Sequence, residues 1–173
     1  MSETQDMMAS ALEAAIAATL SREDIDALLA RLPEAGGPAG IVLEGEPAMA
    51  MALADDDRPI TITYLPGFPG LVLSAPVCDV EDLPRLVLLR LLAANATWEI
   101  TAGGIFAIPT PGGPLTYCRR IALPDLAAAS CVEAMDAFAA YCADWEQRLD
   151  LYAELPEGED PSTVAGAPGV IPV

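Results

Sequence analysis

The sequence predicts an α+β domain in which helices pack on an antiparallel sheet, in the order α-β-β-β-α-β-β-α. Apolar residues recur at helical spacing near the amino terminus and again over residues 124–154. Short segments of strand character, separated by turns rich in Pro, Gly and Asp, lie between residues 48 and 78. An apolar helix and a β-hairpin follow them. Strands that follow one another through short turns favour an antiparallel sheet over alternating βαβ units.

The composition fits one domain with a strongly negative charge. The chain has 173 residues, of which 53% are hydrophobic, enough for a packed core. Its formal net charge is −18, and it contains no histidine. Such a field repels nucleic acid and anionic lipid, so neither is an expected partner. The negative field favours a basic or neutral protein partner. An equally good interpretation is that the acidic residues only maintain solubility.

The amino-terminal part predicts two helical segments. Residues 4–20 place apolar side chains at helical spacing, as an additional segment before the main fold. Ser21 then begins "SREDIDALLARLP", where Ser21 and Asp24 resemble a capping box. Proline and glycine in "PEAGGPAG" end this second segment.

Three strands are predicted next. "GIVLE" is a possible short strand before them. "AMAMALAD", "PITITYLP" and "LVLSAPVC" are separated by the turns "DDDRP" and "PGFPG", and we expect them to form an antiparallel meander.

The helix predicted over residues 83–95, "LPRLVLLRLLAAN", is apolar almost all the way round, with only Arg85 and Arg90 charged. A helix on one sheet needs an apolar stripe of about 100° or somewhat more. The excess predicts a homodimer seam on this helix. The alternative is a central helix held between the sheet and the last helix. The predicted interface residues are Leu83, Leu86, Val87, Leu89, Arg90 and Leu91.

The remaining chain predicts a hairpin, a long helix and a tail. The hairpin strands are Ile105–Ile108 and Leu115–Ala122, joined by "PTPGG". The single domain is expected to cover residues 1–155, with 1–20 as the additional helical segment. The acidic, Pro- and Gly-rich residues 156–173 predict a disordered tail.

No motif for catalysis, a cofactor or a metal is present in the sequence. There is no histidine to act as a base or ligand, and the four cysteines form no CxxC pair. The glycine-rich "TAGGIFAIPTPGG" lacks the Lys-Ser/Thr of a phosphate loop. We therefore expect a binding protein. The alternative is a small enzyme whose active site uses carboxylates. The longest apolar runs end before the ~20 residues of a bilayer-spanning helix, and we expect a cytoplasmic protein.

Three segments of the second half carry a family resemblance. They are the leucine-rich "LLRLLAAN", the hairpin "GGIFAIPTPGGPLTYCRRIAL" and the closing "MDAFAAYCADWEQRL", which contains Trp145. In order and spacing the chain resembles, over about residues 24–149, the class I type III secretion chaperones of the Tir chaperone (CesT) family. The segment before Ser21 and the long Pro/Gly connection depart from that pattern.

The resemblance implies a homodimeric bacterial cytoplasmic chaperone that needs no cofactor. Its partner would be the amino-terminal region of a secreted effector, kept soluble and competent for secretion. A non-secretory module of the same fold, which binds a regulatory protein, is the alternative. We expect an extended client segment to contact the first helical region and the sheet, unless these side chains are all core. The expected contact residues are Ile25, Leu28, Leu29, Ile62 and Tyr64.

Removal of the tail after Leu155 is expected to leave folding and self-association intact, because the tail offers few apolar anchors. Thermal unfolding and sedimentation of residues 1–155 test this. A large loss of thermal stability would show that the tail packs on the domain.

Overall fold

The computed structural model describes residues 20–54, 57–68, 70–123 and 127–154, and it confirms the predicted α+β class and order of elements. The predicted tail 156–173 and all of the segment 1–20 except Leu20 lie outside these residues. The elements are α2 (Arg22–Ala30), the 3₁₀ helix η1 (Leu32–Ala35), β1 (Ala48–Leu53), β2 (Pro59–Tyr64), β3 (Gly70–Cys78), the 3₁₀ helix η2 (Val80–Asp82), α3 (Arg85–Ala96), β4 (Gly104–Ala107), β5 (Leu115–Ala122) and α4 (Ala128–Glu154).

The five strands form one antiparallel sheet in the order β1-β2-β3-β5-β4. The predicted meander of β1, β2 and β3 and the predicted β4–β5 hairpin are both confirmed. Strand β5 pairs with β3, so β1 and β4 are the two edges. The possible strand "GIVLE" is wrong: this segment makes only an isolated bridge between Glu44 and Met49.

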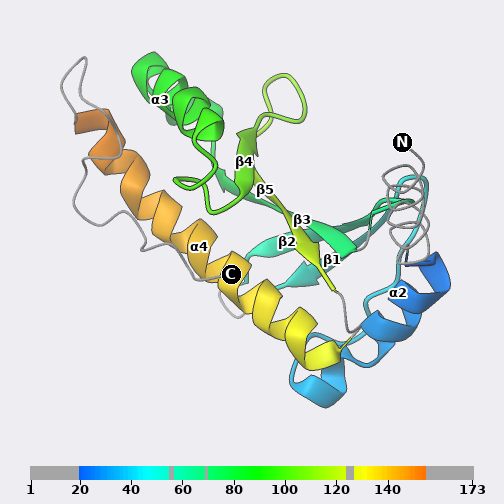
Figure 1. Ribbon diagram of the computed structural model, residues 1–173. Helices are drawn as coiled ribbons and strands as arrows, with labels where there is room; N and C mark the ends of the chain where they lie inside the picture. The colour runs from blue at the N-terminus through cyan, green and yellow to red at the C-terminus, as the bar shows by residue number, and fades with distance from the viewer. Residues whose placement is uncertain (1–19, 55–56, 69, 124–126, 155–173) are drawn as a thin grey trace, which may run out of the picture.

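One face of the sheet is covered by helices and forms the core. The inner face carries Ile60, Ile62 and Tyr64 of β2, which alternate with half-buried residues along the strand. These side chains belong to one buried cluster with residues of α2, η1 and α4. Figure 1 shows α4 running the length of the molecule, past η1 at one end and α3 at the other.

Aromatic side chains join α4 to the β4–β5 hairpin. The rings of Phe106 and Trp145 lie 4.6 Å apart in an edge-on arrangement, and Tyr117 stacks on Phe138 with centroids 5.5 Å apart. The Tyr117 hydroxyl donates to the Thr101 carbonyl at 2.6 Å. Burial raises the pKa of Tyr117, so this hydroxyl keeps its proton and remains a donor.

The capping box predicted at the start of α2 is confirmed. The Ser21 hydroxyl accepts from the Asp24 N–H, while the Asp24 carboxylate accepts from the Ser21 N–H. The Ser21 hydroxyl also donates to the Asp24 carboxylate at 2.7 Å. This bond, together with the one from the Ser21 N–H, lowers the pKa of Asp24 because both favour its charged form. The box places α2 where its apolar side can join the core.

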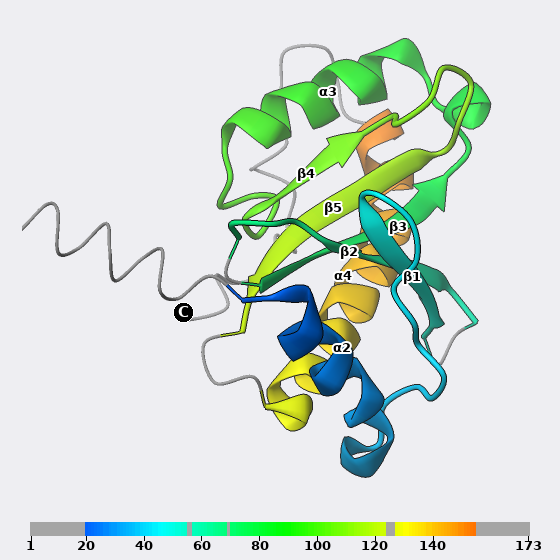
Figure 2. The same ribbon diagram turned by 90° about the vertical axis from the view of Figure 1, so that its right-hand side faces the viewer.

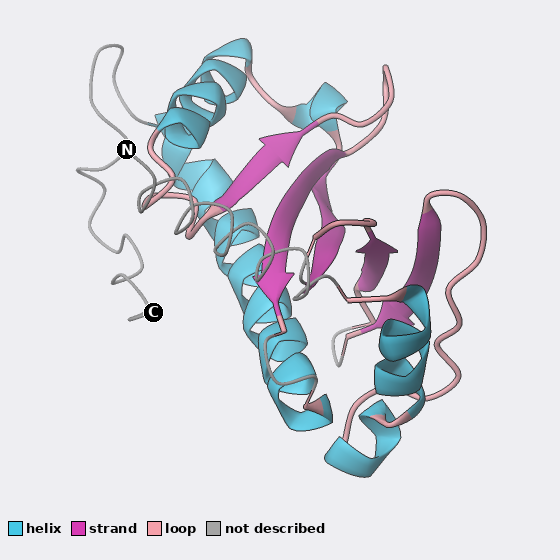
Figure 3. Cartoon of the chain, turned by 45° about the vertical axis from the view of Figure 1, so that its right-hand side comes forward, coloured by secondary structure: helices cyan, strands magenta, loops and turns pink. Residues whose placement is uncertain are grey.

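The outer edge of β4 is closed by side chains rather than by another strand. Asn95 of α3 donates to the Phe106 carbonyl at 2.9 Å and accepts from the Phe106 N–H at 2.8 Å. Two positions earlier, Gly104 donates to the Thr101 carbonyl and accepts from the Thr101 hydroxyl. Figures 2 and 3 show α3 lying beside β4, so the helix covers this edge.

Replacement of Asn95 by alanine is expected to cost about 2–3 kcal/mol of unfolding free energy, because two backbone groups of Phe106 lose their partners. Urea denaturation measures this. The exposed Ala93→Ser change on the same helix serves as the control and should cost less than about 0.5 kcal/mol. Equal midpoints for the two variants would contradict the edge-closing role of Asn95.

Candidate partner-binding surface

The five residues expected to contact a client are all in the core of the described chain. Ile25, Leu28 and Leu29 are at most 1% exposed, and Ile62 is 0% and Tyr64 8% exposed. This placement corrects the sequence interpretation, since side chains so deeply buried are out of a client's reach in this conformation. The physical reason is that the apolar stripe of α2 and the apolar face of β2 are used against each other and against α4.

The predicted interface residues of α3 divide between two sides of the helix. Val87, Arg90 and Leu91 are buried and face their own chain. They are therefore core residues, and the prediction that they form a dimer interface is corrected. Leu83 and Leu86 are half-buried, and Leu89 is 51% exposed. Since positions 87, 91 and 94 are spaced by about one turn, a single stripe faces the core, and α3 is not enclosed on all sides.

The sequence interpretation missed Leu92, which is 63% exposed and lies one turn after Leu89. The spacing of three residues from Leu89 is the signal that would have found it. Other exposed apolar side chains follow α3 in the chain: Trp98, Ile105 and Ile108. These apolar side chains are exposed to solvent in the described chain.

The second face of the sheet, opposite the helices, also carries exposed apolar side chains, and we call it the open face. Paired residues of an antiparallel sheet share a face. One such row runs Met51, Thr61, Ser74, Cys118 and Ile105 across all five strands. Its two ends are the most exposed, with Met51 at 68% and Ile105 at 52%, and Leu53 near Met51 is 60% exposed.

The free edge of the sheet lies along β1. Met49 uses its N–H and carbonyl to pair with Glu44, on the side away from β2. Because backbone groups alternate in direction along an antiparallel strand, those of Met51 and Leu53 also point away from β2. Leu53 pairs with Pro59, which has no N–H to donate, in agreement with this direction. No other described strand covers them.

A pocket of about 210 Å³ lies where β1 ends. Leu53 and Ile60 line it from the sheet, and Val132 and Met135 line it from α4. Its size suits one large apolar side chain, since a cavity of ~150 Å³ already holds a benzene ring. Asp136 at the same pocket adds a negative charge beside the apolar lining.

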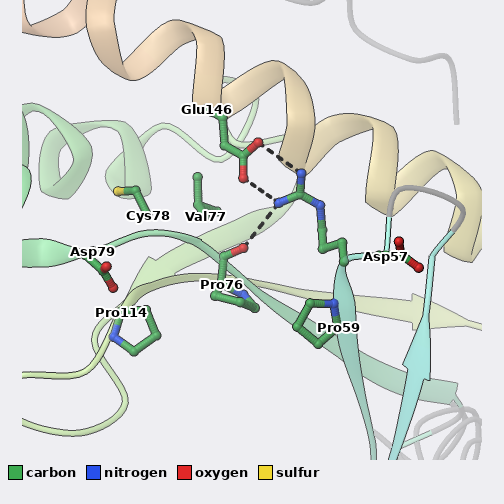
Figure 4. Close-up of a pocket in the computed structure, with 9 residues that line it drawn as sticks. Asp57, Pro59, Pro76, Val77, Cys78, Asp79, Pro114 and Glu146 are labelled. Atoms are coloured by element: carbon green, nitrogen blue, oxygen red, sulfur yellow. Dashed lines mark hydrogen bonds and ion pairs between the residues drawn. The ribbon is translucent and has the colours of Figure 1, made fainter.

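A larger hollow of about 350 Å³ lies at the other side of the β1–β2 turn and contains Asp57, Asp79 and Glu146 (Figure 4). Arg58 binds both oxygens of Glu146, at 2.6 and 3.0 Å, and donates to the Pro76 carbonyl at 3.3 Å. This contact joins the start of β2 and the body of β3 to α4. We interpret the hollow as structural rather than as a binding site, because its Arg58 and Glu146 form an ion pair with each other.

Within the described ranges, no three His, Cys, Asp or Glu side chains converge as metal ligands would. Among the same residues, no helix has both the length and the apolar content to cross a membrane.

A family model described as the Tir chaperone protein (CesT) family matches residues 27–146, which is more than half of the chain. The chain belongs to the Tir chaperone protein (CesT) family. The match confirms the resemblance seen in the sequence. It begins inside α2 and ends inside α4, so the helical segment before Ser21 lies outside it.

Two solved structures share the fold of this CesT-family chain. A chain from the ExsC–ExsE complex has a TM-score of 0.57 and 21% identity, over 78% of this chain and 97% of that one. A chain from the HopA1–SchA chaperone–effector complex has a TM-score of 0.57 and 15% identity, over 74% of this chain and 98% of that one. No curated protein matches the sequence.

Proposed function

We propose that this chain is a type III secretion chaperone, which binds the amino-terminal region of a secreted effector and keeps it soluble and extended. The observation that carries the proposal is the combination of a free β1 edge and exposed Met51 and Leu53 in a member of the CesT family. The HopA1–SchA structure, which shares the fold, is itself a chaperone–effector complex. We propose that the chain acts in the bacterial cytoplasm, with no cofactor and no catalytic step.

The client segment would bind by adding a strand to β1. The outward N–H and carbonyl groups of Met51 and Leu53 supply main-chain hydrogen bonds that do not depend on the client's sequence. Side chains of the added strand would alternate between the open face and the inner side. On the inner side, the pocket beside Ile60 and Met135 accepts one large apolar anchor. Burial of such anchors keeps the client soluble without any input of energy.

The charges around β1 suit a client with basic residues. Glu44 and Glu46 precede the strand, Asp57 follows it, and Asp136 lies at the pocket. Together with the net charge of −18, these carboxylates speed the encounter with a basic segment. They also repel other copies of the chaperone, which keeps the loaded complex dispersed.

We further propose that two copies pair through α3, along Leu89 and Leu92. Residues 83–123 contain four of the eight arginines and only one of the 26 acidic residues, Glu99. Two chains of charge −18 repel each other, so contact is least unfavourable through this segment. Trp98 and Ile108, which follow α3 in the chain, are exposed as well.

Client binding is tested by replacing Met51 with proline. Its N–H points outward, so proline removes one donor from the edge without breaking the β1–β2 ladder. The parent chain is expected to co-purify from its host with an effector whose amino-terminal region resists proteolysis. Met51→Pro should lose that effector at an unchanged melting temperature.

Ala52→Pro is the matched control, because the Ala52 N–H faces β2 and its loss should cost about 2 kcal/mol or more. If Met51→Pro retains the same effector, strand addition at β1 is wrong. If the parent chain captures only a folded regulatory protein, the alternative of a regulatory binding module is favoured instead.

The dimer is tested by Leu89→Asp combined with Leu92→Asp. Both side chains are exposed in the single chain, so the charges should separate the dimer without unfolding it. Sedimentation at micromolar concentration should show a dimer for the parent and a monomer for the variant. Met51→Pro should remain dimeric. A parent chain that sediments as a monomer would rule out pairing through α3.

A further inference from the structure

The pocket at the end of β1 is built by three segments that lie far apart in the chain. Ile60 of the sheet and Met135 of α4 belong to the buried core, so the pocket lies on the helix-covered side of the sheet. Leu53, the last residue of β1, also lines it. The third segment is the loop 36–38, which follows η1. A client strand added to β1 therefore passes beside this pocket.

The loop wall of the pocket depends on two glycines. Gly36 ends η1 with a φ of 84°, a left-handed conformation that glycine adopts without strain. A Cβ at Gly37 would lie 2.6 Å from the Val132 Cγ2, closer than side chains pack. The loop therefore approaches α4 as only a residue without a side chain can, and it closes one side of the pocket against Val132.

The register of β1 shows which client residue would meet the pocket. Ile60, which lines the pocket, pairs with Ala52. Paired residues of an antiparallel sheet share a face, so a client residue opposite Ala52 points to the same side as Ile60. Ala52 is 4% exposed and has only a methyl group there, so it leaves the space beside it to a larger client side chain. We call this client position the anchor.

One charge lies at this pocket. Asp136 is the only charged residue among those that line it, and it is exposed. No arginine of the described ranges forms an ion pair with it. Such a carboxylate attracts a basic client side chain and repels an acidic one.

The distances match a basic residue two positions from the anchor. A round pocket of about 210 Å³ is about 7 Å across, so Asp136 lies within ~7 Å of an anchor that fills it. Residues i and i+2 of a strand point to the same face and lie ~6.8 Å apart. An arginine or lysine at that position therefore reaches Asp136, while its aliphatic stem packs on the apolar rim.

We propose that the pocket and Asp136 together select a two-residue pattern in the client: a large apolar anchor, and an arginine or lysine two positions before or after it. This inference rests on the proposed function, because the client strand on β1 brings both residues to the pocket. The main-chain hydrogen bonds of strand addition accept any sequence, so side-chain contacts supply the choice of segment. Asp136 is then a specificity-determining residue, which favours a basic residue and rejects an acidic one at the same place.

Three peptides that can form an added strand test this pattern. TRVLVRT has leucine as the anchor and arginine on both sides of it, so the result does not depend on the direction of the added strand. TQVLVQT replaces both arginines by glutamine, and TRVAVRT replaces the anchor by alanine. Fluorescence polarisation of the labelled peptides at low ionic strength gives the dissociation constant of each for the full chain.

The parent chain is expected to bind TRVLVRT more tightly than TQVLVQT. Asp136→Asn should reduce this preference about five-fold, as for one partly exposed ion pair. Glu99→Gln, an exposed position in the loop before β4, is the matched control and should keep the preference of the parent. Each change removes one negative charge, so the comparison separates Asp136 from the general field of the chain.

The anchor is tested by TRVAVRT, which should bind the parent about ten-fold more weakly than TRVLVRT because it leaves the pocket empty. The two peptides have the same charge, so this difference reports on the pocket and not on Asp136.

An equal preference for TRVLVRT in the parent, in Asp136→Asn and in Glu99→Gln would overturn the role of Asp136. Equal binding of TRVLVRT and TRVAVRT would overturn the anchor, and failure of the parent to bind any of the peptides would overturn the whole inference. These outcomes leave strand addition standing. That proposal is judged by the loss of the co-purified effector in Met51→Pro, and Met51 does not line the pocket.

Discussion

In the part of the chain that the structure describes, helices cover one face of the sheet and leave the other open, and most features of this fold follow from that constraint. The inner face uses the apolar alternation of β2 and β3 against α2, η1 and α4. Because helix α4 must span the whole sheet, it carries an aromatic series in which Phe138, Tyr141 and Trp145 meet Tyr117 and Phe106. The cluster holds the hairpin and the long helix as one unit, and leaves the opposite face without a helix among the described residues.

The two edges of the sheet are treated differently. At β4, side chains of Asn95 and Thr101 satisfy the outward backbone groups and remove that edge from pairing. At β1, pairing with Glu44 stops at Met49, and the next outward positions belong to Met51 and Leu53. An edge that presents free backbone groups beside exposed methionines is a hazard for a soluble protein unless it serves a partner. Methionine suits varied partners because its side chain is unbranched and adapts to different shapes.

The charge distribution also differs between the β1 edge and the β4 edge. Acidic residues lie around β1 and the pocket at its end, whereas residues 83–123 contain a single acid. The acidic part suits a basic extended client, and the part poor in acids suits a second copy of the chain. The proposed client site and the proposed dimer contact therefore lie at opposite edges of the sheet, and in this arrangement the two contacts need not compete.

Periodicity in the sequence was sufficient to predict the class, the order of elements, the meander and the hairpin, whereas the family came from the resemblance of three segments in the second half. The elements depend on local alternation and on turn residues, which act within a few positions of each other. The phase of each apolar face was not predictable. Ile25, Leu28, Leu29, Ile62 and Tyr64 are core and Leu92 is exposed, because only the packed structure decides which of several apolar stripes the core uses.

The closure of β4 by Asn95 and the free edge of β1 were equally hidden. Both depend on strand order and on backbone direction between residues that are far apart in the chain. The sequence alone determined that this protein has more apolar surface than one sheet and three helices need. Only the tertiary structure decided where the excess lies, because burial is a property of contacts between elements and not of any single element.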